Sequence, residues 1–378
     1  MTITSKDEAT MTDTTGTITA PASQPAHNAI STRPPLLEID DLAIHFRSPR
    51  GVARVVDGTT LTIHQNEIVG VAGESGSGKT TLVEAILQII RFPNRETRGS
   101  VMFTPRSGPK VDLMKANDRQ MRRLRLNEIA YVPQGSMNSL NPVARVGDQI
   151  VDGMVDHGLG QREARDRIPG ILERVGLDPK VARLYPHELS GGMKQRVIIA
   201  IAISMNPSLI IADEPTTALD VNVQRKILAT LSQLRNELNV AIMIVSHDLP
   251  VHAQLVDRIA IMYAGQIVEA GDIRSTVKTP LHPYARGLMN AIPSIGKPRE
   301  RLEGIKGATP SPLNWPPGCR FHNRCPHVMA VCQDVPPILA TVTTGDRDTG
   351  DGIVLVQPGR EVACHLYPES TPKEAQPS

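Results

Sequence analysis

The chain has 378 residues, with 41 Lys and Arg against 39 Asp and Glu, and aromatic residues make up 3% of it. This length suffices for one large domain and a smaller one. The balanced charge, the lack of a basic block and the few aromatic residues argue against nucleic acid as the main partner. The longest apolar run, Val197–Met205, is too short to span a bilayer, which needs about 20 residues. We therefore expect any membrane role to depend on a partner.

The N-terminal segment, residues 1–33, is rich in Thr, Ser, Ala and Pro. It lacks the basic start, the apolar segment and the cleavage site of a signal peptide. We expect a disordered tail on a cytosolic protein.

Short apolar stretches in the first part of the chain predict strands that begin an antiparallel layer. They lie at residues 36–44, 54–56, 61–64 and 68–72, followed by 99–103 and 129–132. The polar, basic segment 110–125 indicates a surface helix.

From about residue 135 to 207, charged helical stretches replace the strands and predict a helical subdomain. One of them, residues 162–175, contains Pro169 and Gly170, where we expect the helix to break. Strands then alternate with helices, which is typical of a parallel sheet covered on both faces. The strands are expected at 209–212, 241–245 and 258–262, and the helices at 221–238 and 250–255.

Composition changes again after residue 272, where Pro and Gly become frequent and all four cysteines occur. The sequence thus predicts an α/β domain at residues 34–272, with a mixed sheet, an antiparallel β-layer and a helical subdomain. A separate small Pro/Gly-rich module is expected at residues 273–378.

A glycine-rich loop lies between the apolar run 68–72 and a helical segment. This strand–turn–helix context is the one that a phosphate-binding loop requires. The glycines let successive backbone N–H groups point at an anion, and the helix N-terminus adds to the positive field. Lys79 can reach the β- and γ-phosphates, and the Thr80 hydroxyl can ligate Mg²⁺. The loop consists of Gly73, Glu74, Ser75, Gly76, Ser77, Gly78, Lys79 and Thr80.

Two acids follow the buried stretch 209–212, at the carboxyl end of a predicted strand, where ligands bind in open α/β sheets. Asp213 is suited to hold Mg²⁺, directly or through water. Glu214 is then free to orient or deprotonate the attacking water.

Two further polar residues come directly after predicted strands. Gln134 can ligate Mg²⁺ through its amide oxygen, and the helical subdomain begins right after it. His247 follows the strand at 241–245, where a neutral imidazole can contact the γ-phosphate and sense its loss.

A second phosphate-facing surface is predicted at residues 189–195, Leu-Ser-Gly-Gly-Met-Lys-Gln. Ser190 is placed to cap the following helix, and Gly191 and Gly192 leave its first N–H groups open to an anion. Because the chain already has one phosphate loop, this surface is expected to serve a nucleotide held by another subunit.

Over residues 36–271 the sequence resembles the ATP-binding-cassette (ABC) ATPases. Gly73–Thr81 is similar to the first phosphate-binding motif, with Thr81 included, and Asp213 to the acid associated with Mg²⁺. The other motifs that the resemblance identifies are the catalytic Glu214, the Q-loop Gln134, the signature Ser190–Gly192, the D-loop Ala218–Asp220 ending in Asp220, the switch His247 and the adenine-stacking Phe46.

The resemblance implies an ATP-hydrolysing P-loop core that works as a pair. Two such domains close head to tail around two ATP molecules, and each site combines one subunit's phosphate loop with the other's signature. Hydrolysis reopens them, and the helical subdomain passes the motion to membrane partners, with the contact expected at residues 135–149.

The C-terminal motifs Thr279–Arg286 and Gly318–Pro326 resemble the C-terminal extension of oligopeptide/dipeptide importer ATPases. Met193 in the signature resembles the first of the two unlike ATPase subunits in such importers. The implied partners are a second ATPase of a different sequence, two transmembrane permeases and an extracytoplasmic solute-binding protein. Some relatives import nickel complexes instead of peptides.

The four cysteines, Cys319, Cys325, Cys332 and Cys364, all lie in the C-terminal module. Disulfides are disfavoured in a cytosolic chain, so the thiols suggest a metal site. Zinc, an iron–sulfur cluster and free thiols remain open from the residues alone. Some members of the importer family carry a [4Fe–4S] cluster here, so the resemblance favours the cluster.

Two rival functions share parts of this pattern. A soluble ABC protein acting on DNA or the ribosome would carry a long coiled coil or two fused cassettes, and this sequence has neither. An accessory ABC protein of phosphonate breakdown shares the C-terminal motif and remains the closer alternative.

Overall fold

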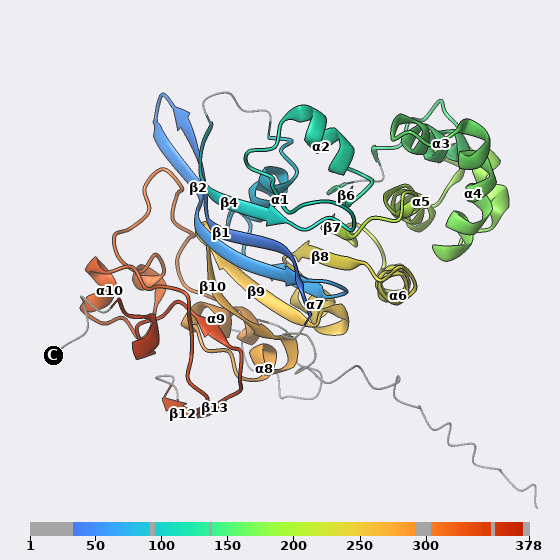
Figure 1. Ribbon diagram of the computed structural model, residues 1–378. Coiled ribbons are helices and arrows are strands. Elements are labelled where there is room, and N and C mark those ends of the chain that lie inside the picture. The colour runs from blue at the N-terminus through green and yellow to red at the C-terminus, as the bar shows by residue number, and fades with distance from the viewer. Residues whose placement is uncertain (1–32, 91–94, 136–137, 292–303, 349–351, 373–378) are drawn as a thin grey trace, which may run out of the picture.

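The structure is a computed structural model that describes residues 33–90, 95–135, 138–291, 304–348 and 352–372. The expected N-terminal tail, apart from Arg33, lies outside these residues. The centre is a mixed sheet with the strand order β11-β14-β10-β9-β3-β8-β7-β6 (Figure 1). Its parallel strands are β3 (Ile68–Ala72), β6 (Ile129–Val132), β7 (Leu209–Asp213), β8 (Ala241–Ser246) and β9 (Arg258–Tyr263).

A second, antiparallel sheet has the order β2-β1-β4-β5. Its strands are β1 (Pro35–Ser48), β2 (Gly51–His64), β4 (Arg95–Phe103) and β5 (Val111–Asp112). The sequence predicts two short strands at 54–56 and 61–64, but β2 is one continuous strand. Gly58, at φ 86°, together with shifts in the pairing with β1, lets the strand continue through the interruption.

The central sheet is covered on both faces because its strands are apolar on both sides. In β3, Val69 and Val71 pack with helix α1 (Lys79–Ile86) and the antiparallel sheet. Ile68 and Ala72 point to the other face and pack with the core of the helices. That core includes α5 (Gly191–Ile203), α6 (Val221–Leu238) and α7 (Leu249–Leu255). The expectation of a covered parallel sheet is confirmed.

The helical subdomain contains α3 (Val146–Asp156), α4 (Gln161–Arg174) and the start of α5, beside the edge strand β6 (Figure 1). The expected break at Pro169 is wrong, because α4 runs through it. Ala164 before the proline and Ile171 and Leu172 after it are buried in one core. The free energy gained by burial on both sides of the proline offsets the cost of the hydrogen bond that the proline removes.

The surface helix expected at 110–125 is shorter, α2 (Asp118–Leu124). Asn117 begins it with a capping box, accepting from the N–H of Gln120 while the Gln120 side chain accepts from the N–H of Asn117. Among the described residues, no helix is both long and apolar enough to cross a membrane.

The segment after residue 272 is built onto the central sheet. Strand β14 (Glu361–Val362) pairs with β10 (Gln266–Asp272), and β11 (Ala340–Thr341) pairs with β14. Phe321 and Tyr284 belong to the same core as the helices. The remaining elements are α8 (Ile273–Lys278), α9 (Pro283–Asn290), α10 (Val331–Asp334), β12 (Gly345–Asp348) and β13 (Ile353–Val356). We keep the term C-terminal module for residues 273–378, although its strands continue the sheet.

A buried ion pair joins this module to β10. Arg360 donates to Glu269, and both side chains are fully buried. Glu269 also accepts from the backbone N–H groups of Leu281 at 3.0 Å and His282 at 2.7 Å. The carboxylate therefore connects three segments of the chain.

Arg360→Leu is expected to lower the free energy of unfolding by about 3–5 kcal/mol, because it leaves the Glu269 carboxylate buried without its cation. Urea denaturation measures the change. The matched control is Arg347→Ala, which breaks the partly exposed pair with Glu369 and is expected to cost no more than about 1 kcal/mol. Equal effects of the two variants would contradict a stabilising role for the buried pair.

Candidate functional site

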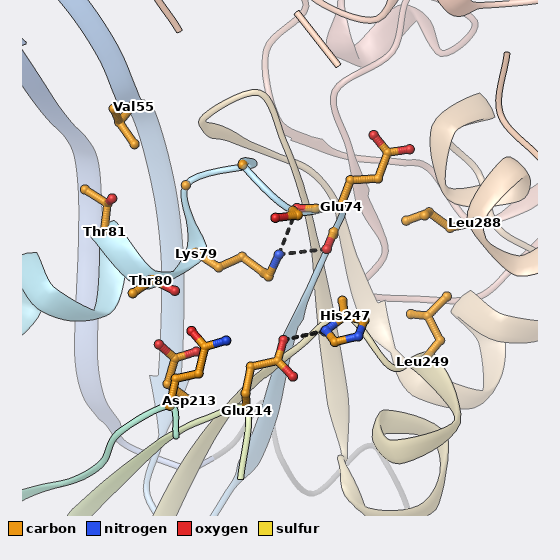
Figure 2. Close-up of a pocket in the computed structure, with 15 residues that line it drawn as sticks. Val55, Glu74, Lys79, Thr80, Thr81, Asp213, Glu214, His247, Leu249 and Leu288 are labelled. Atoms are coloured by element: carbon orange, nitrogen blue, oxygen red, sulfur yellow. Dashed lines mark hydrogen bonds and ion pairs between the residues drawn. The ribbon is translucent and has the colours of Figure 1, made fainter. Parts of the chain in front are cut away.

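A cavity of about 580 Å³ lies at the carboxyl ends of β3, β7 and β8 (Figure 2). Strand order explains the position, because parallel neighbours end at the same edge of the sheet. The volume is typical of a small-ligand site. Its lining residues are Val55, Gly73, Glu74, Ser75, Gly76, Gly78, Lys79, Thr80, Thr81, Gln134, Asp213, Glu214, His247, Leu249 and Leu288.

The loop from β3 to α1 has the predicted strand–turn–helix form. Gly78 has φ 103° and precedes the helix directly. A Cβ there would lie 2.5 Å from the carbonyl oxygen of Val55, and a Cβ on Gly73 would lie 2.1 Å from that of Met262. Glycine is therefore required at both positions by the backbone of neighbouring strands.

Lys79 begins α1 and extends its ammonium across the loop. It donates to the carbonyl oxygens of Gly73 at 2.7 Å and Glu74 at 2.9 Å (Figure 2). Burial lowers the pKa of Lys79, and the nearby carboxylates of Glu214 and Asp213 oppose this shift. A phosphate oxygen entering the loop would find the Lys79 cation at the start of α1.

Asp213, the last residue of β7, has the features of a metal ligand. Both of its carboxylate oxygens are buried and lack a hydrogen-bond partner among the residues that the structure describes. Burial raises the pKa of this carboxyl to about 6, although the nearby Thr80 hydroxyl acts in the opposite direction. Gln134 lines the same cavity. A carboxylate, a hydroxyl and an amide are oxygen donors of the kind that Mg²⁺ prefers, so this set fits the ion.

Glu214 is adjacent in sequence but has different surroundings. His247 Nδ1 lies 2.7 Å from its Oε1, and the Thr217 hydroxyl donates to its Oε2 at 2.9 Å. Burial opposes ionisation, but these hydrogen bonds outweigh it and hold the pKa of Glu214 below its usual value. The carboxylate is thus ionised, as a general base requires.

The contact with Glu214 also determines which nitrogen of His247 carries a proton. A carboxylate only accepts hydrogen bonds, so Nδ1 must donate. The neutral ring then presents an acceptor at Nε2. The side chain is 65% exposed, so this nitrogen is accessible from the cavity opening.

The signature and D-loop residues lie beside each other, at the starts of α5 and α6. Ser190 caps α5 by accepting from the N–H of Met193, as the sequence predicts, and Asp220 caps α6. A Cβ on Gly192 would lie 2.6 Å from Val223, so the two helix starts are in close contact. Ser190 and Asp220 are exposed, and neither is among the described residues that line the cavity.

Phe46 is not among the described lining residues either. It is partly buried against the core that contains the antiparallel sheet, whereas Val55 of β2 lines the cavity. Its role in stacking on adenine stays a prediction. Three apolar lining residues, Val55, Leu249 and Leu288, are not predicted from the sequence, because ordinary apolar residues carry no local motif.

Within the described residues none of the four cysteines forms a disulfide; Cys325 is half-buried and the other three are buried. No three or more His, Cys, Asp or Glu side chains within the described part of the chain are grouped to hold a metal ion. The prediction of a cluster therefore has no support from ligand geometry.

Burial of the sulfurs disfavours thiolates, and backbone N–H groups offset this effect only in part. The N–H of His327 donates to Cys325 Sγ at 3.4 Å, and the N–H of Leu366 does the same for Cys364. Burial raises the pKa of Cys319 to about 11, while the N–H groups of Phe321 and His322 lower it. Backbone N–H groups directed at sulfur stabilise the charged form, which is the form that binds metals.

Asp213 generates a prediction with a definite sign. Because its folded-state pKa is raised, the stability contributed by the protonated form is lost as pH rises through about 6. Asp213→Asn is therefore expected to unfold at a higher temperature than the native chain at pH 7.5 without Mg²⁺, and at a similar temperature near pH 4. Scanning calorimetry at both pH values measures this. If the difference in unfolding temperature between Asp213→Asn and the native chain were the same at both pH values, the raised pKa of Asp213 would be contradicted.

Comparison with known proteins agrees with this geometry. Residues 56–217 match the ABC transporter family, and residues 268–332 match the family described as oligopeptide/dipeptide transporter, C-terminal region. Among solved structures, the dimeric post-hydrolysis state of the ATP-binding cassette MJ0796 bound to ADP and Pi aligns with a TM-score of 0.54 and 26% identity. The alignment covers 63% of this chain and 99% of the MJ0796 chain.

Two curated relatives extend over most of the chain. The oligopeptide transport ATP-binding protein AppD of Bacillus subtilis is 38% identical over 337 residues, which is 88% of this chain and 97% of the relative. The dipeptide transport ATP-binding protein DppD of Escherichia coli is 39% identical over 313 residues, 82% of this chain and 94% of the relative. The chain therefore belongs to the ABC transporter family of ATPases, in the group that carries the oligopeptide/dipeptide transporter C-terminal region.

Proposed function

We propose that this chain is the ATP-hydrolysing subunit of a membrane importer for oligopeptides or dipeptides, bound peripherally at the cytoplasmic face through two permeases. The main support is that the phosphate loop, Asp213 and Glu214 line one cavity, and that the same chain carries the transporter C-terminal region. The names of the relatives AppD and DppD support peptides as the solute. A second ATPase of different sequence and an extracytoplasmic solute-binding protein complete the proposed system.

The cavity supports a division of roles during hydrolysis. The loop Gly73–Thr81 and Lys79 bind the triphosphate, with charge-assisted contacts to its oxygens. Thr80, Asp213 and Gln134 would hold Mg²⁺, which would neutralise part of the phosphate charge. Glu214 accepts the proton of the attacking water, and His247 holds its carboxylate in position through Nδ1.

The position of Ser190, which is exposed, and of Gly191 and Gly192, which are partly exposed, supports a paired arrangement. These residues can serve a nucleotide on a second subunit, and Asp220 beside them would lie in the same contact. The dimeric structure of MJ0796 is in keeping with such a pair. Residues 135–149 are the proposed contact with the permeases, although 136 and 137 lie outside the described residues.

Glu214→Gln is expected to lower ATP turnover at least about 100-fold while ATP binding is retained, because the variant removes the base and leaves the phosphate loop intact. Lys79→Ala is expected to lose ATP binding itself. Steady-state hydrolysis and equilibrium nucleotide titration separate the two effects. Native turnover by Glu214→Gln would remove Glu214 from the catalytic role.

Purification of the tagged chain from native membranes tests the transport proposal. We expect two integral membrane proteins and a second ATPase to co-purify, and ATP turnover of the reconstituted complex to rise with a peptide-loaded binding protein. Stimulation by a nickel complex instead of peptides would identify another solute. Co-purification with phosphonate-degrading enzymes and without membrane proteins would contradict the importer.

For the C-terminal module, we propose that Cys319, Cys325, Cys332 and Cys364 hold a [4Fe–4S] cluster. The support is the presence of four thiols in one module and the N–H groups directed at the sulfurs of Cys319, Cys325 and Cys364. A cluster would brace a segment rich in Pro and Gly.

Protein purified without oxygen is expected to be brown, to absorb at about 400 nm and to contain iron and sulfide. Cys364→Ser is expected to lose this absorbance. A colourless preparation containing zinc, or no metal, would contradict the cluster.

A further inference from the structure

The C-terminal module holds the phosphate-binding loop from outside the cavity, through Glu74. The backbone N–H of Glu74 donates to the Tyr284 hydroxyl at 2.9 Å. Its carboxylate accepts from both terminal nitrogens of Arg324, at 3.0 and 3.2 Å. The Thr309 hydroxyl donates to the same carboxylate at 2.5 Å. These three partners lie more than 200 residues after the loop, so tertiary structure alone brings them there.

Arg324 is itself held in a defined orientation. Its side chain is 7% exposed. The guanidinium lies over the rings of Tyr263 and Phe321, at 5.8 and 5.9 Å from their centres. Its Nε donates to the carbonyl oxygen of Lys306 at 3.0 Å. A guanidinium restrained in this way can bind a carboxylate with two parallel hydrogen bonds at little further entropic cost.

Glu74 connects this arginine to the phosphate-binding lysine. The Glu74 carbonyl oxygen accepts from Lys79, whereas its side chain points away from Lys79 (Figure 2). Ser75 and Gly76, which follow, are exposed. The direction of the Glu74 peptide therefore influences how the next N–H groups of the loop face the cavity.

The module also contacts the opposite wall of the cavity, on β2. Trp315 Nε1 donates to the carbonyl oxygen of Arg54 at 2.8 Å, next to the lining residue Val55. Arg320 donates to the carboxylate of Asp57. The module thus spans both sides of the nucleotide cavity.

From these contacts we propose that Arg324 is a positioning residue: acting through Glu74, it holds the phosphate-binding loop in the conformation that accepts ATP. A loop that must be ordered when the nucleotide binds loses affinity, because part of the binding free energy is used for ordering. The C-terminal module therefore contributes to the ATP affinity of the core through its contact with Glu74.

The test is a double-mutant cycle on the purified full-length chain, read as the Kd for a fluorescent ATP analogue with Mg²⁺. Arg324→Ala and Glu74→Gln are each expected to raise Kd about tenfold, since a charge-assisted hydrogen-bond pair is lost. The Kd of the double variant is expected to lie within about twofold of the Kd of the weaker-binding single variant, because the Arg324–Glu74 pair can be lost only once. Arg324→Lys, which keeps the charge but not the fork, is expected to regain part of the affinity.

Arg347→Ala is the matched control, because it removes an arginine–glutamate pair of the same module that does not contact the loop. Its Kd is expected to equal that of the native chain. If Arg324→Ala fails to fold, the near-isosteric Glu74→Gln still has to raise Kd. Native affinity in Glu74→Gln, or effects of the two substitutions that multiply in the double variant, would overturn the proposal.

Discussion

The close approach of the phosphate-binding loop to its neighbouring strands is the constraint on which the site depends. The backbone at Gly73 runs against Met262 of β9, and the backbone at Gly78 runs against Val55 of β2. No side chain fits at either contact. The curvature of the loop is therefore imposed by strands on both sides of it, β9 next to β3 in the central sheet and β2 of the antiparallel sheet.

Around this loop, two adjacent acids acquire opposite properties. Burial raises the pKa of Asp213 despite the nearby Thr80 hydroxyl, whereas His247 and Thr217 hold the pKa of Glu214 low. Environments that separate the pKa values of neighbouring carboxyls commonly assign them to different tasks. Here the unpaired acid suits a cation and the hydrogen-bonded acid suits a water molecule.

The C-terminal module is joined to the ATPase core through the central sheet, a buried ion pair and a common apolar core. Its strands β11 and β14 continue the central sheet, and Arg360 neutralises Glu269 beneath them. Phe321 contributes to the core that also contains the helices. Because the same segment provides Arg324 and Tyr284 to Glu74, disturbing its fold would affect the nucleotide cavity directly.

The sequence by itself determined the strand–loop–helix at 68–86, the acids at the end of β7, His247 after β8 and the cap at Ser190. Each depends on residues close together in the chain, where glycine, charge and apolar periodicity have local meaning. Continuity of β2 and of α4 across Pro169 was decided by pairing and burial with distant segments. So were the contacts of Glu74 with Tyr284 and Arg324, which join residues 210 and 250 positions apart. Such contacts leave no pattern in the sequence, because only the folded sheet brings their partners together.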